Sequence, residues 1–250
     1  MFDINGKVAV VTGGANGIGL ATVKAILAKG GHPIIADYNE EAGKREAEAL
    51  GIPFYKIDIS DEEKVKEMFD DIIAKNEHLD ILVNGAGIGG NSRPITAPDS
   101  LELAKRSFNV NVHGTLNCCK YAIAQMQKQG GNCAVVNVAS ILGVVSNPNS
   151  IGYSGSKHAV IGITKSLALE NAPQNIRVNV LCPGFTDTAM FNKDLYGEQI
   201  YNYILGLQPL SKGTGRAANV DEQAHAIIFM IENSYLTGQS IIVDGGYTVQ

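Results

Sequence analysis

A tyrosine and a lysine four residues apart, with a serine upstream, could carry out acid–base chemistry in this chain. Tyr153 and Lys157 lie in the run Tyr-Ser-Gly-Ser-Lys, and Ser140 ends an apolar run. Residues at i and i+4 share one helix face, so the ammonium of Lys157 can lie beside the phenol of Tyr153. A nearby positive charge stabilises phenolate, so we expect it to lower the Tyr153 pKa from its ordinary value of about 10. The pair predicts a proton-transferring tyrosine, although such pairs also occur on ordinary solvated faces.

A glycine-rich segment near the amino terminus supports the catalytic interpretation. It follows a short run rich in β-branched residues, Lys7–Val11, which predicts a strand buried on both faces. Glycines allow a tight turn and close approach of a ligand to the backbone, and the next helix offers free N–H groups to a pyrophosphate. This strand–turn–helix context predicts a dinucleotide-binding loop. The residues assigned to it are Gly13, Asn16, Gly17, Ile18 and Gly19.

An acidic residue about twenty positions after the loop predicts the cofactor. The expected strand Pro33–Ala36 ends in Asp37, whose carboxylate suits the hydroxyls of an adenosine ribose and repels a 2′-phosphate. Tyr38 supplies no positive charge that would reverse this preference. The sequence therefore predicts NAD(H) rather than NADP(H). The alternative is that Asp37 only caps the helix expected to start near Glu40.

Together these segments resemble the classical short-chain dehydrogenase/reductase family over essentially the whole chain. The matching positions are the glycine signature Thr12 to Gly19, the strand end Asn84-Gly85-Ala86-Gly87, Asn111 in Asn-Val-His-Gly, the set Ser140, Tyr153 and Lys157, the turn from Pro183 to Thr188, and Asp244-Gly245-Gly246. One position departs from the family, which has Asn where this chain has Gly85. Glycine keeps the turn and removes one amide, so we expect little functional loss.

The resemblance implies hydride transfer between NAD(H) and a secondary alcohol or ketone. It implies that Tyr153 exchanges the proton, that Ser140 hydrogen-bonds the substrate oxygen, that Lys157 also holds the nicotinamide ribose, and that Asn111 positions a water in a proton relay. The full cofactor set adds Asp37, Tyr38, Asp58, Ile59, Asn84, Gly85, Ala86, Gly87, Tyr153, Lys157, Pro183, Gly184, Phe185, Thr186 and Thr188 to the glycine loop.

A long insertion after the Pro183-Gly184 turn predicts a substrate lid at about 185–215. The segment is rich in apolar and aromatic residues, which implies an apolar or ring-bearing substrate such as a hydroxysteroid, a cyclic alcohol or a diol. The alternative is that the same residues only pack the lid down. The expected substrate-contacting residues are Ser140, Leu142, Tyr153, Phe185 and Met190.

Alternating patterns predict one doubly wound (Rossmann) α/β domain over residues 1–250, with a parallel sheet of about seven strands and helices on both faces. Its ligands would bind at the carboxyl ends of the strands. The expected strands are Lys7–Val11, Pro33–Ala36, Pro53–Lys56, Ile81–Val83, Ala134–Val138, Ile176–Leu181 and Ser240–Val243. The expected helices are Gly17–Lys29, Glu40–Leu50, Glu62–Lys75, Leu101–Met126, Tyr153–Glu170 and Asp221–Ile231.

Composition limits the possible partners. A net charge of −5 and the lack of a basic run argue against nucleic-acid binding. No apolar run reaches the 18 or so residues of a membrane span, and the amino terminus shows no signal pattern, so we expect a cytoplasmic protein. The four cysteines and five histidines show no metal-binding spacing, so we assign no metal and expect buried thiols.

The resemblance also implies a homotetramer or homodimer paired through the two long expected helices. Apolar residues spread around more of each helix than one core face requires. They are Val110, Leu116, Cys119, Ala122, Ile123 and Met126 on the first, and Ile161, Ile163, Leu167 and Leu169 on the second.

Three other functions remain open. An epimerase or dehydratase would use the same Tyr/Lys pair, but it usually has a larger carboxyl-terminal domain than 250 residues can supply. An enoyl reductase would separate its Tyr and Lys by more than four positions. A non-catalytic NAD(H)-binding redox sensor would not need the complete set of Asn111, Ser140, Tyr153 and Lys157.

Overall fold

The computed structural model describes residues 1–89 and 93–250 and confirms the doubly wound α/β class. All pairings within its seven-stranded sheet are parallel, and the strand order is β3-β2-β1-β4-β5-β6-β7. The strands are β1 (Val8–Thr12), β2 (His32–Asp37), β3 (Phe54–Lys56), β4 (Ile81–Asn84), β5 (Cys133–Val138), β6 (Ile176–Pro183) and β7 (Ser240–Val243).

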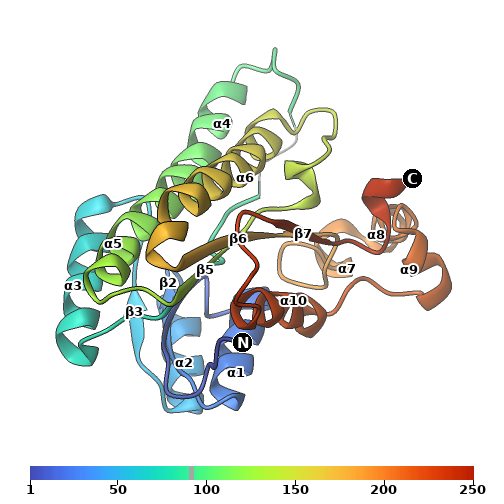
Figure 1. The fold of residues 1–250 in the computed structure, drawn as a ribbon. Helices are drawn as coiled ribbons and strands as arrows, with labels where there is room; N and C mark the ends of the chain where they lie inside the picture. The colour runs from blue at the N-terminus through green and yellow to red at the C-terminus, as the bar shows by residue number, and fades with distance from the viewer. Residues whose placement is uncertain (90–92) are drawn as a thin grey trace.

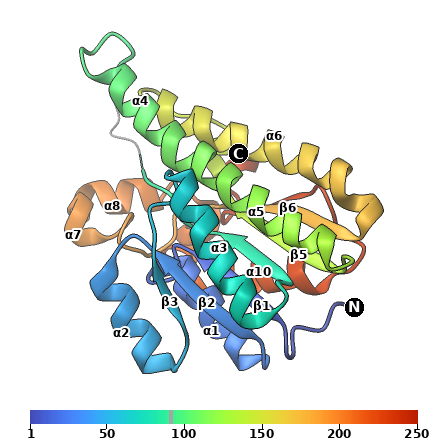
Figure 2. The same ribbon diagram turned by 90° about the vertical axis from the view of Figure 1, so that its left-hand side faces the viewer.

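Helices cover both faces of this sheet (Figures 1 and 2). One face carries α1 (Gly17–Ala28), α2 (Glu40–Leu50) and α10 (Val220–Glu232), and the other carries α3 (Glu62–Asn76), α4 (Ser100–Phe108), α5 (Thr115–Lys128) and α6 (Ile151–Asn171). Successive strand residues point to opposite faces. Thus Val10 packs with Phe69 of α3, and Val11 packs in the other core cluster with Ile26 of α1.

The order in which strands are added to the sheet reverses between β1 and β4, and such a point is where a ligand is expected to bind. The chain first adds β2 and β3 on one side of β1, and then crosses to β4 on its other side. Thr12 and Asn84, the last residues of the two strands, are register partners. In open α/β sheets ligands bind in the crevice at such a switch point, outside the carboxyl ends of the strands.

The expected element boundaries agree with the structure within two residues, with one exception. The exception lies inside the expected helix Leu101–Met126: the chain is helical without interruption from Ser100 to Lys128, but a π-helical turn, Asn109–Gly114, lies between α4 and α5. The hydrophobic pattern does not reveal the turn, because apolar residues continue through it. Its cause is tertiary, since Asn111 in this turn hydrogen-bonds to the backbone of another segment.

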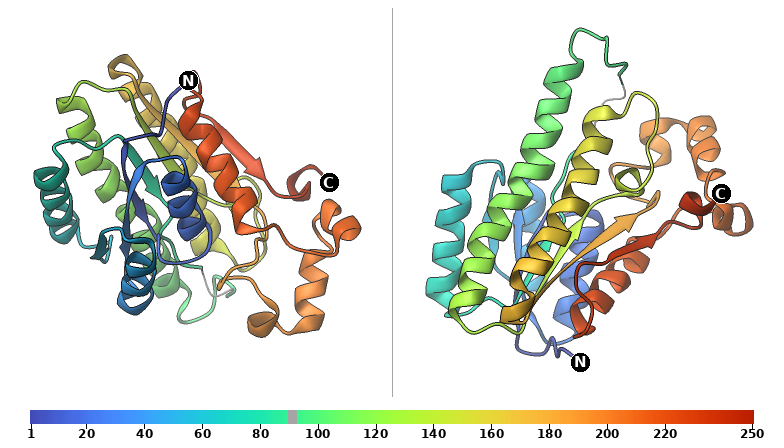
Figure 3. Two further views of the ribbon diagram at one scale, coloured as in Figure 1. Left: turned by 90° about the horizontal axis from the view of Figure 1, so that it is seen from below. Right: turned by 45° about the horizontal axis from the view of Figure 1, so that its top comes forward.

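The segment expected as a lid folds into three short helices, α7 (Lys193–Tyr196), α8 (Glu198–Leu205) and α9 (Pro209–Thr214). These helices project beyond the sheet, and the carboxyl terminus lies beside them (Figure 3). A small aromatic cluster holds the lid together: Phe191 stacks on Tyr201 at 4.7 Å and lies 5.0 Å from Phe185 between ring centroids.

Two features are absent from residues 1–89 and 93–250. Within these residues, no helix has both the length and the apolarity that a bilayer span requires. In the same residues, no group of three or more His, Cys, Asp or Glu side chains could hold a metal ion. All four cysteines are buried, in agreement with the expectation from their spacing.

Candidate active site

The glycine loop forms a cradle lined by backbone atoms. Gly13 has a φ of +67°, and a Cβ there would lie 2.7 Å from the backbone N of Ala86. A Cβ on Gly19 would collide with the carbonyl oxygen of Gly13. Side chains at these two positions are therefore excluded, and the ends of β1 and β4 approach each other closely. This arrangement fits a dinucleotide, whose pyrophosphate needs close approach to the backbone.

The first turn of α1 is open to an anion. Asn16 precedes the helix in an extended conformation, its side chain makes no capping hydrogen bond, and no acidic residue lies in the first turn. The site for a Cβ on Gly17 is 3.3 Å from Cγ2 of Thr188, so the chain after β6 reaches this turn. The uncapped N–H groups and the helix dipole favour a phosphate here.

Asp37 lies where a ribose would bind. It is the last residue of β2, and its Oδ2 accepts a hydrogen bond from the backbone N of Ala15 in the glycine loop at 3.0 Å. Oδ1 accepts a hydrogen bond from the backbone N of Asn39 at 2.9 Å. These bonds fix the carboxylate beside the loop while leaving lone pairs for ribose hydroxyls. The neighbouring Tyr38 is 72% exposed, so its ring is free to move.

The end of β4 contributes backbone rather than side chains. The Asn84 amide is buried and donates to Oδ1 of Asn137 at 2.9 Å, so a cofactor contact from Asn84 would have to come from its backbone. A Cβ on Gly85 would lie 2.8 Å from the carbonyl oxygen of Thr12. The departure from the family at Gly85 therefore suits the close packing of this chain. Ala86 donates from its backbone N to Oγ1 of Thr12 at 3.2 Å.

Asp58 and Ile59, the two predicted cofactor-binding residues after β3, differ in their burial. Oδ1 of Asp58 accepts hydrogen bonds from the backbone N of Ser60 at 3.0 Å and from its hydroxyl at 2.7 Å, and the residue is half-buried. Ile59 is 4% exposed and packs in the core under Gly114. Its role in cofactor binding stays a prediction, which the side chain does not support.

Ser140 is oriented by the short turn that follows β5. It precedes the 3-10 turn Ile141–Gly143, and its Oγ accepts a hydrogen bond from the backbone N of Leu142 at 3.1 Å. The hydroxyl proton is therefore free to be donated elsewhere. A Cβ on Gly143 would lie 2.8 Å from the carbonyl oxygen of Lys157, so glycine allows α6 to pack against this turn. The turn thus brings Ser140 to the amino-terminal part of α6.

Tyr153 and Lys157 lie together on α6, but the expected effect on the pKa of Tyr153 is wrong. Burial raises the pKa of Tyr153, hydrogen bonding to Ser140 opposes this rise, and the nearby Tyr196 phenol adds to it. The ammonium of Lys157 lies 5.7 Å from the centre of the Tyr153 ring and donates to the carbonyl oxygen of Val138 at 3.0 Å. Its ammonium thus hydrogen-bonds to a strand end and lies over the phenol ring.

The surroundings of Lys157 disfavour the charged form of its side chain. Its side chain is buried, the residue being 6% exposed, and burial lowers the pKa of its ammonium from 10.5 to about 8. Desolvation disfavours the charged form of a lysine, and the single carbonyl partner does not offset this. A lysine with this pKa can exchange protons close to neutral pH.

Asn111 connects the π-helical turn to the active site. Its Oδ1 accepts from the backbone N of Ile88 at 2.8 Å, and its Nδ2 donates to the carbonyl oxygen of Ile88 at 3.1 Å and to Oγ of Ser156 at 3.0 Å. The position for a Cβ on Gly87 lies 3.1 Å from Oδ1 of Asn111 and 3.3 Å from Nζ of Lys157. The turn therefore places the Asn111 amide near the ammonium, as its predicted relay role requires.

The chain after β6 is held by two glutamines that the sequence did not identify. Gln208, 2% exposed, accepts a hydrogen bond through Oε1 from the backbone N of Phe185 at 2.9 Å. Gln223 is fully buried and donates from Nε2 to Oγ1 of Thr186 at 3.2 Å. These bonds position the segment that follows Pro183 and Gly184. The sequence signal was weak, because glutamine alone indicates no function and both partners are distant in the chain.

The lid residues divide into a packed set and an exposed set. Phe191, Tyr201 and Leu205 are buried in the lid's own cluster. Met190 is 53% exposed and Phe185 is half-buried, so both remain available to a substrate. Some apolar residues of the segment therefore pack the lid down, and others are exposed where a substrate could contact them.

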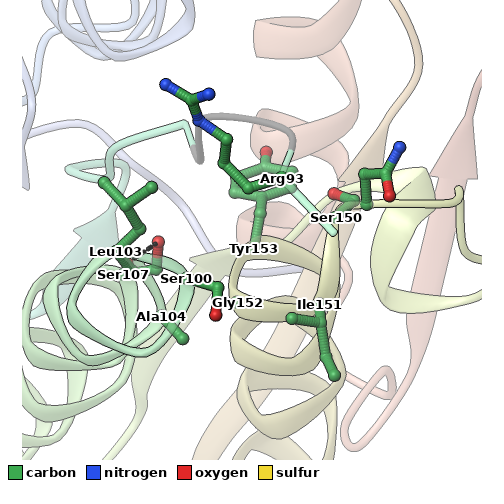
Figure 4. Close-up of a pocket in the computed structure, with 10 residues that line it drawn as sticks. Arg93, Ser100, Leu103, Ala104, Ser107, Ser150, Ile151, Gly152 and Tyr153 are labelled. Atoms are coloured by element: carbon green, nitrogen blue, oxygen red, sulfur yellow. Dashed lines mark hydrogen bonds between the residues drawn. The ribbon is translucent and has the colours of Figure 1, made fainter. Parts of the chain in front are cut away.

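A surface pocket reaches Tyr153 between α4 and the first turn of α6 (Figure 4). Tyr153 and Gly152 line it from α6, Ser100 and Leu103 line it from α4, and Arg93 lies at its edge. Leu142, Phe185 and Met190 are not among the described residues that line it. The contact of these three residues with a substrate therefore stays a prediction that this pocket does not support.

The amino-acid sequence matches known proteins over its whole length. A family model described as Enoyl-(Acyl carrier protein) reductase matches residues 13–248. The chain is 37% identical to a 2,5-dichloro-2,5-cyclohexadiene-1,4-diol dehydrogenase of Sphingobium indicum, with 99% of each chain covered.

Solved structures give the same result for the fold. ElxO with NADP bound has a TM-score of 0.89 at 33% identity, covering 98% of this chain and 100% of that one. A 3-ketoacyl-(acyl-carrier-protein) reductase from Brucella melitensis complexed with NADH has a TM-score of 0.87 at 30% identity, with the same coverage. The neighbours thus include one structure with each form of the nicotinamide cofactor.

Proposed function

The chain belongs to the classical short-chain dehydrogenase/reductase family, and from this premise we propose that it is an NAD-dependent dehydrogenase of secondary alcohols. The observation that carries the proposal is the convergence of Ser140, Tyr153, Lys157 and Asn111 beside a backbone cradle that fits a dinucleotide. A sensor that only binds the cofactor would have no use for this proton-transfer set.

Each of these four residues has its own role in the proposed reaction. The nicotinamide cofactor supplies the hydride acceptor when bound. The Ser140 hydroxyl donates a hydrogen bond to the substrate oxygen and thereby holds this oxygen near Tyr153. In its tyrosinate form Tyr153 accepts the hydroxyl proton of the alcohol during oxidation, and in its phenol form it donates a proton to the ketone oxygen during reduction. Lys157 would hold the nicotinamide ribose and pass the proton toward solvent through a water that Asn111 positions.

The preference for NAD(H) rests on Asp37. Its carboxylate is fixed beside the glycine loop, where it can accept hydrogen bonds from ribose hydroxyls and would repel a 2′-phosphate. Structural neighbours with NADP and with NADH show that the fold accommodates either cofactor. The choice therefore depends on local charge, and the local charge favours NAD(H).

The proposed substrate is a ring-bearing secondary alcohol, such as a cyclic alcohol or diol. The half-buried Phe185 and the exposed Met190 offer apolar contacts near the site. The diol dehydrogenase of Sphingobium indicum acts, by its name, on a six-membered ring. Enoyl reduction, suggested by the description of the family model, is disfavoured because Tyr153 and Lys157 are four residues apart.

A panel of alcohols tests the proposal. Purified protein is mixed with NAD⁺ or NADP⁺ and with cyclopentanol, cyclohexanol, cyclohexanediols, a hydroxysteroid or a linear secondary alcohol, and formation of the reduced cofactor is followed at 340 nm. We expect turnover of cyclic alcohols with NAD⁺. Turnover of an enoyl thioester without any alcohol activity would refute the proposed reaction class.

We also propose a homodimer or homotetramer paired through α4, α5 and α6. Several residues expected to be in excess of the core, Cys119, Ala122, Ile123 and Met126, are in fact buried within it. The support comes instead from exposed apolar side chains on these helices. They are Leu101, Phe108, Leu116, Ile151 and Leu169, with exposures of 62%, 37%, 36%, 55% and 81%.

A further inference from the structure

We propose that Glu40 is a second determinant of cofactor choice, because it holds Lys44 and Lys56, and Lys56, the register partner of Asp37, would otherwise attract a 2′-phosphate. The inference rests on the proposed preference for NAD(H) and deepens it. Asp37 accounts for repulsion of the phosphate, whereas Glu40 removes a competing attraction.

Strand register places Lys56 beside Asp37. The two residues are Cα partners in the parallel pair β2–β3. Side chains of register partners lie on the same face of a sheet, and neighbouring strands are about 4.8 Å apart. Two positions earlier, the partners Ile35 and Phe54 both pack into the core cluster under α1 and α2. Lys56 therefore rises from the same face as Asp37 and at the same carboxyl edge.

Glu40 holds both nearby lysines. It is the first residue of α2, and Asn39 fixes the start of this helix by accepting the backbone N–H of Ala42 at 3.1 Å. One carboxylate oxygen of Glu40 lies 2.7 Å from Nζ of Lys44, and the other lies 2.7 Å from Nζ of Lys56. The two ammonium groups lower the pKa of Glu40 to about 2, so the carboxylate is charged throughout the physiological pH range.

The effect of removing Glu40 follows from the net charge of four side chains. Asp37 and Glu40 carry two negative charges, and Lys44 and Lys56 carry two positive ones, so the group is neutral. Without Glu40 it would gain a net positive charge, and both ammonium groups would lose this partner, including that of Lys56 on the strand next to Asp37. Lysine is a common phosphate ligand, and a phosphate monoester carries about −1.5 to −2 charges at neutral pH. A freed Lys56 could pair with Asp37 or with the phosphate, and either contact would weaken discrimination.

The test is direct binding of nucleotide fragments to the full-length protein. Isothermal titration calorimetry at low ionic strength compares 2′,5′-ADP with 5′-AMP, which lacks the 2′-phosphate. We expect Glu40→Gln to raise the affinity for 2′,5′-ADP about three- to tenfold, from Coulomb interactions across an aqueous surface. The affinity for 5′-AMP should change less than twofold. Salt should reduce the gain, because exposed charges are screened.

Glu41→Gln is the matched control. It removes the same charge from the next residue, which is also exposed, but its side chain points about 100° away around the helix. It should leave both affinities nearly unchanged. Adding Lys56→Gln to the Glu40→Gln variant should abolish most of the gain. Thermal unfolding confirms that each variant is folded, and Glu40→Ala is a substitute if Glu40→Gln is not.

The outcomes separate this inference from the proposed function. Equal affinities of Glu40→Gln and Glu41→Gln for 2′,5′-ADP would overturn the role of Glu40 and leave the NAD(H) proposal standing. A wild-type protein that binds 2′,5′-ADP more tightly than 5′-AMP would overturn the NAD(H) proposal itself. Persistence of the gain in the double variant would show that Lys56 is not the group released.

Discussion

Replacing Lys157 with methionine should stabilise the protein at pH 7 while removing its activity. The Lys157 ammonium is buried, and its pKa falls from 10.5 to about 8. At about 1.4 kcal/mol for each pKa unit, the buried charge costs roughly 3 kcal/mol at neutral pH. Methionine has a similar length and carries no charge. It leaves the carbonyl oxygen of Val138 without this partner, at a cost of about 1 kcal/mol. The expected net gain is about 2 kcal/mol.

The pH dependence of this gain distinguishes desolvation from better packing. Between pH 8 and 10.5 the lysine is neutral in the folded protein and charged in the unfolded chain, so the unfolded state binds more protons. The stability contributed at Lys157 therefore rises with pH over this window. The advantage of Lys157→Met should be largest at pH 7, shrink above pH 8 and disappear by about pH 10.

Urea unfolding at several pH values, followed by circular dichroism, measures this difference. At pH 7 the melting temperature of Lys157→Met should also be about 4–8 °C higher, given the length of the chain. Lys165→Met is the control, because Lys165 is exposed on the same helix and should change stability by less than about 0.5 kcal/mol. A variant less stable than wild type at pH 7, or a gain independent of pH, would refute the assignment of a desolvation cost to Lys157.

The other predictions concern catalysis, cofactor choice, the lid and assembly. Tyr153→Phe should abolish turnover while NADH binding, measured by fluorescence, stays nearly intact; a variant with a tenth or more of wild-type activity would contradict the proton-transfer role. Asp37→Ala with Tyr38→Arg should shift the kcat/KM ratio toward NADP⁺, whereas equal wild-type efficiency with both cofactors would already oppose the argument. Gln208→Ala leaves the N–H of Phe185 without its acceptor, so the substrate KM should rise about tenfold; an unchanged KM would show that other contacts hold the lid. Light scattering at micromolar concentration should give a multiple of 26.5 kDa, and the single-chain mass would exclude the oligomer.

Local signals account for the parts that were predictable. The strands β1 and β4 are buried runs of mainly apolar residues, and such runs are readable without knowledge of their partners. The glycine loop is equally readable from the sequence, because its backbone requires glycine: Gly13 has a positive φ, and there is no room for a Cβ at Gly19. The helix α2 begins and ends as predicted, since Asn39 caps its start and Gly51, with a φ of 67°, ends it.

The sequence by itself thus determined the alternation of strands and helices and the glycine loop, because each depends on neighbours within a few positions, and its resemblance to a known family supplied the full set of candidate catalytic residues. Only the tertiary structure decided the π-helical turn at Asn111, the hydrogen bond of Gln208 to Phe185 and the pairing of Lys56 with Glu40, since each joins segments distant in the chain. The electrostatics of the site also belong to this second group. The spacing of Tyr153 and Lys157 predicted a lowered tyrosine pKa, but burial raises it, because desolvation depends on everything packed around the phenol.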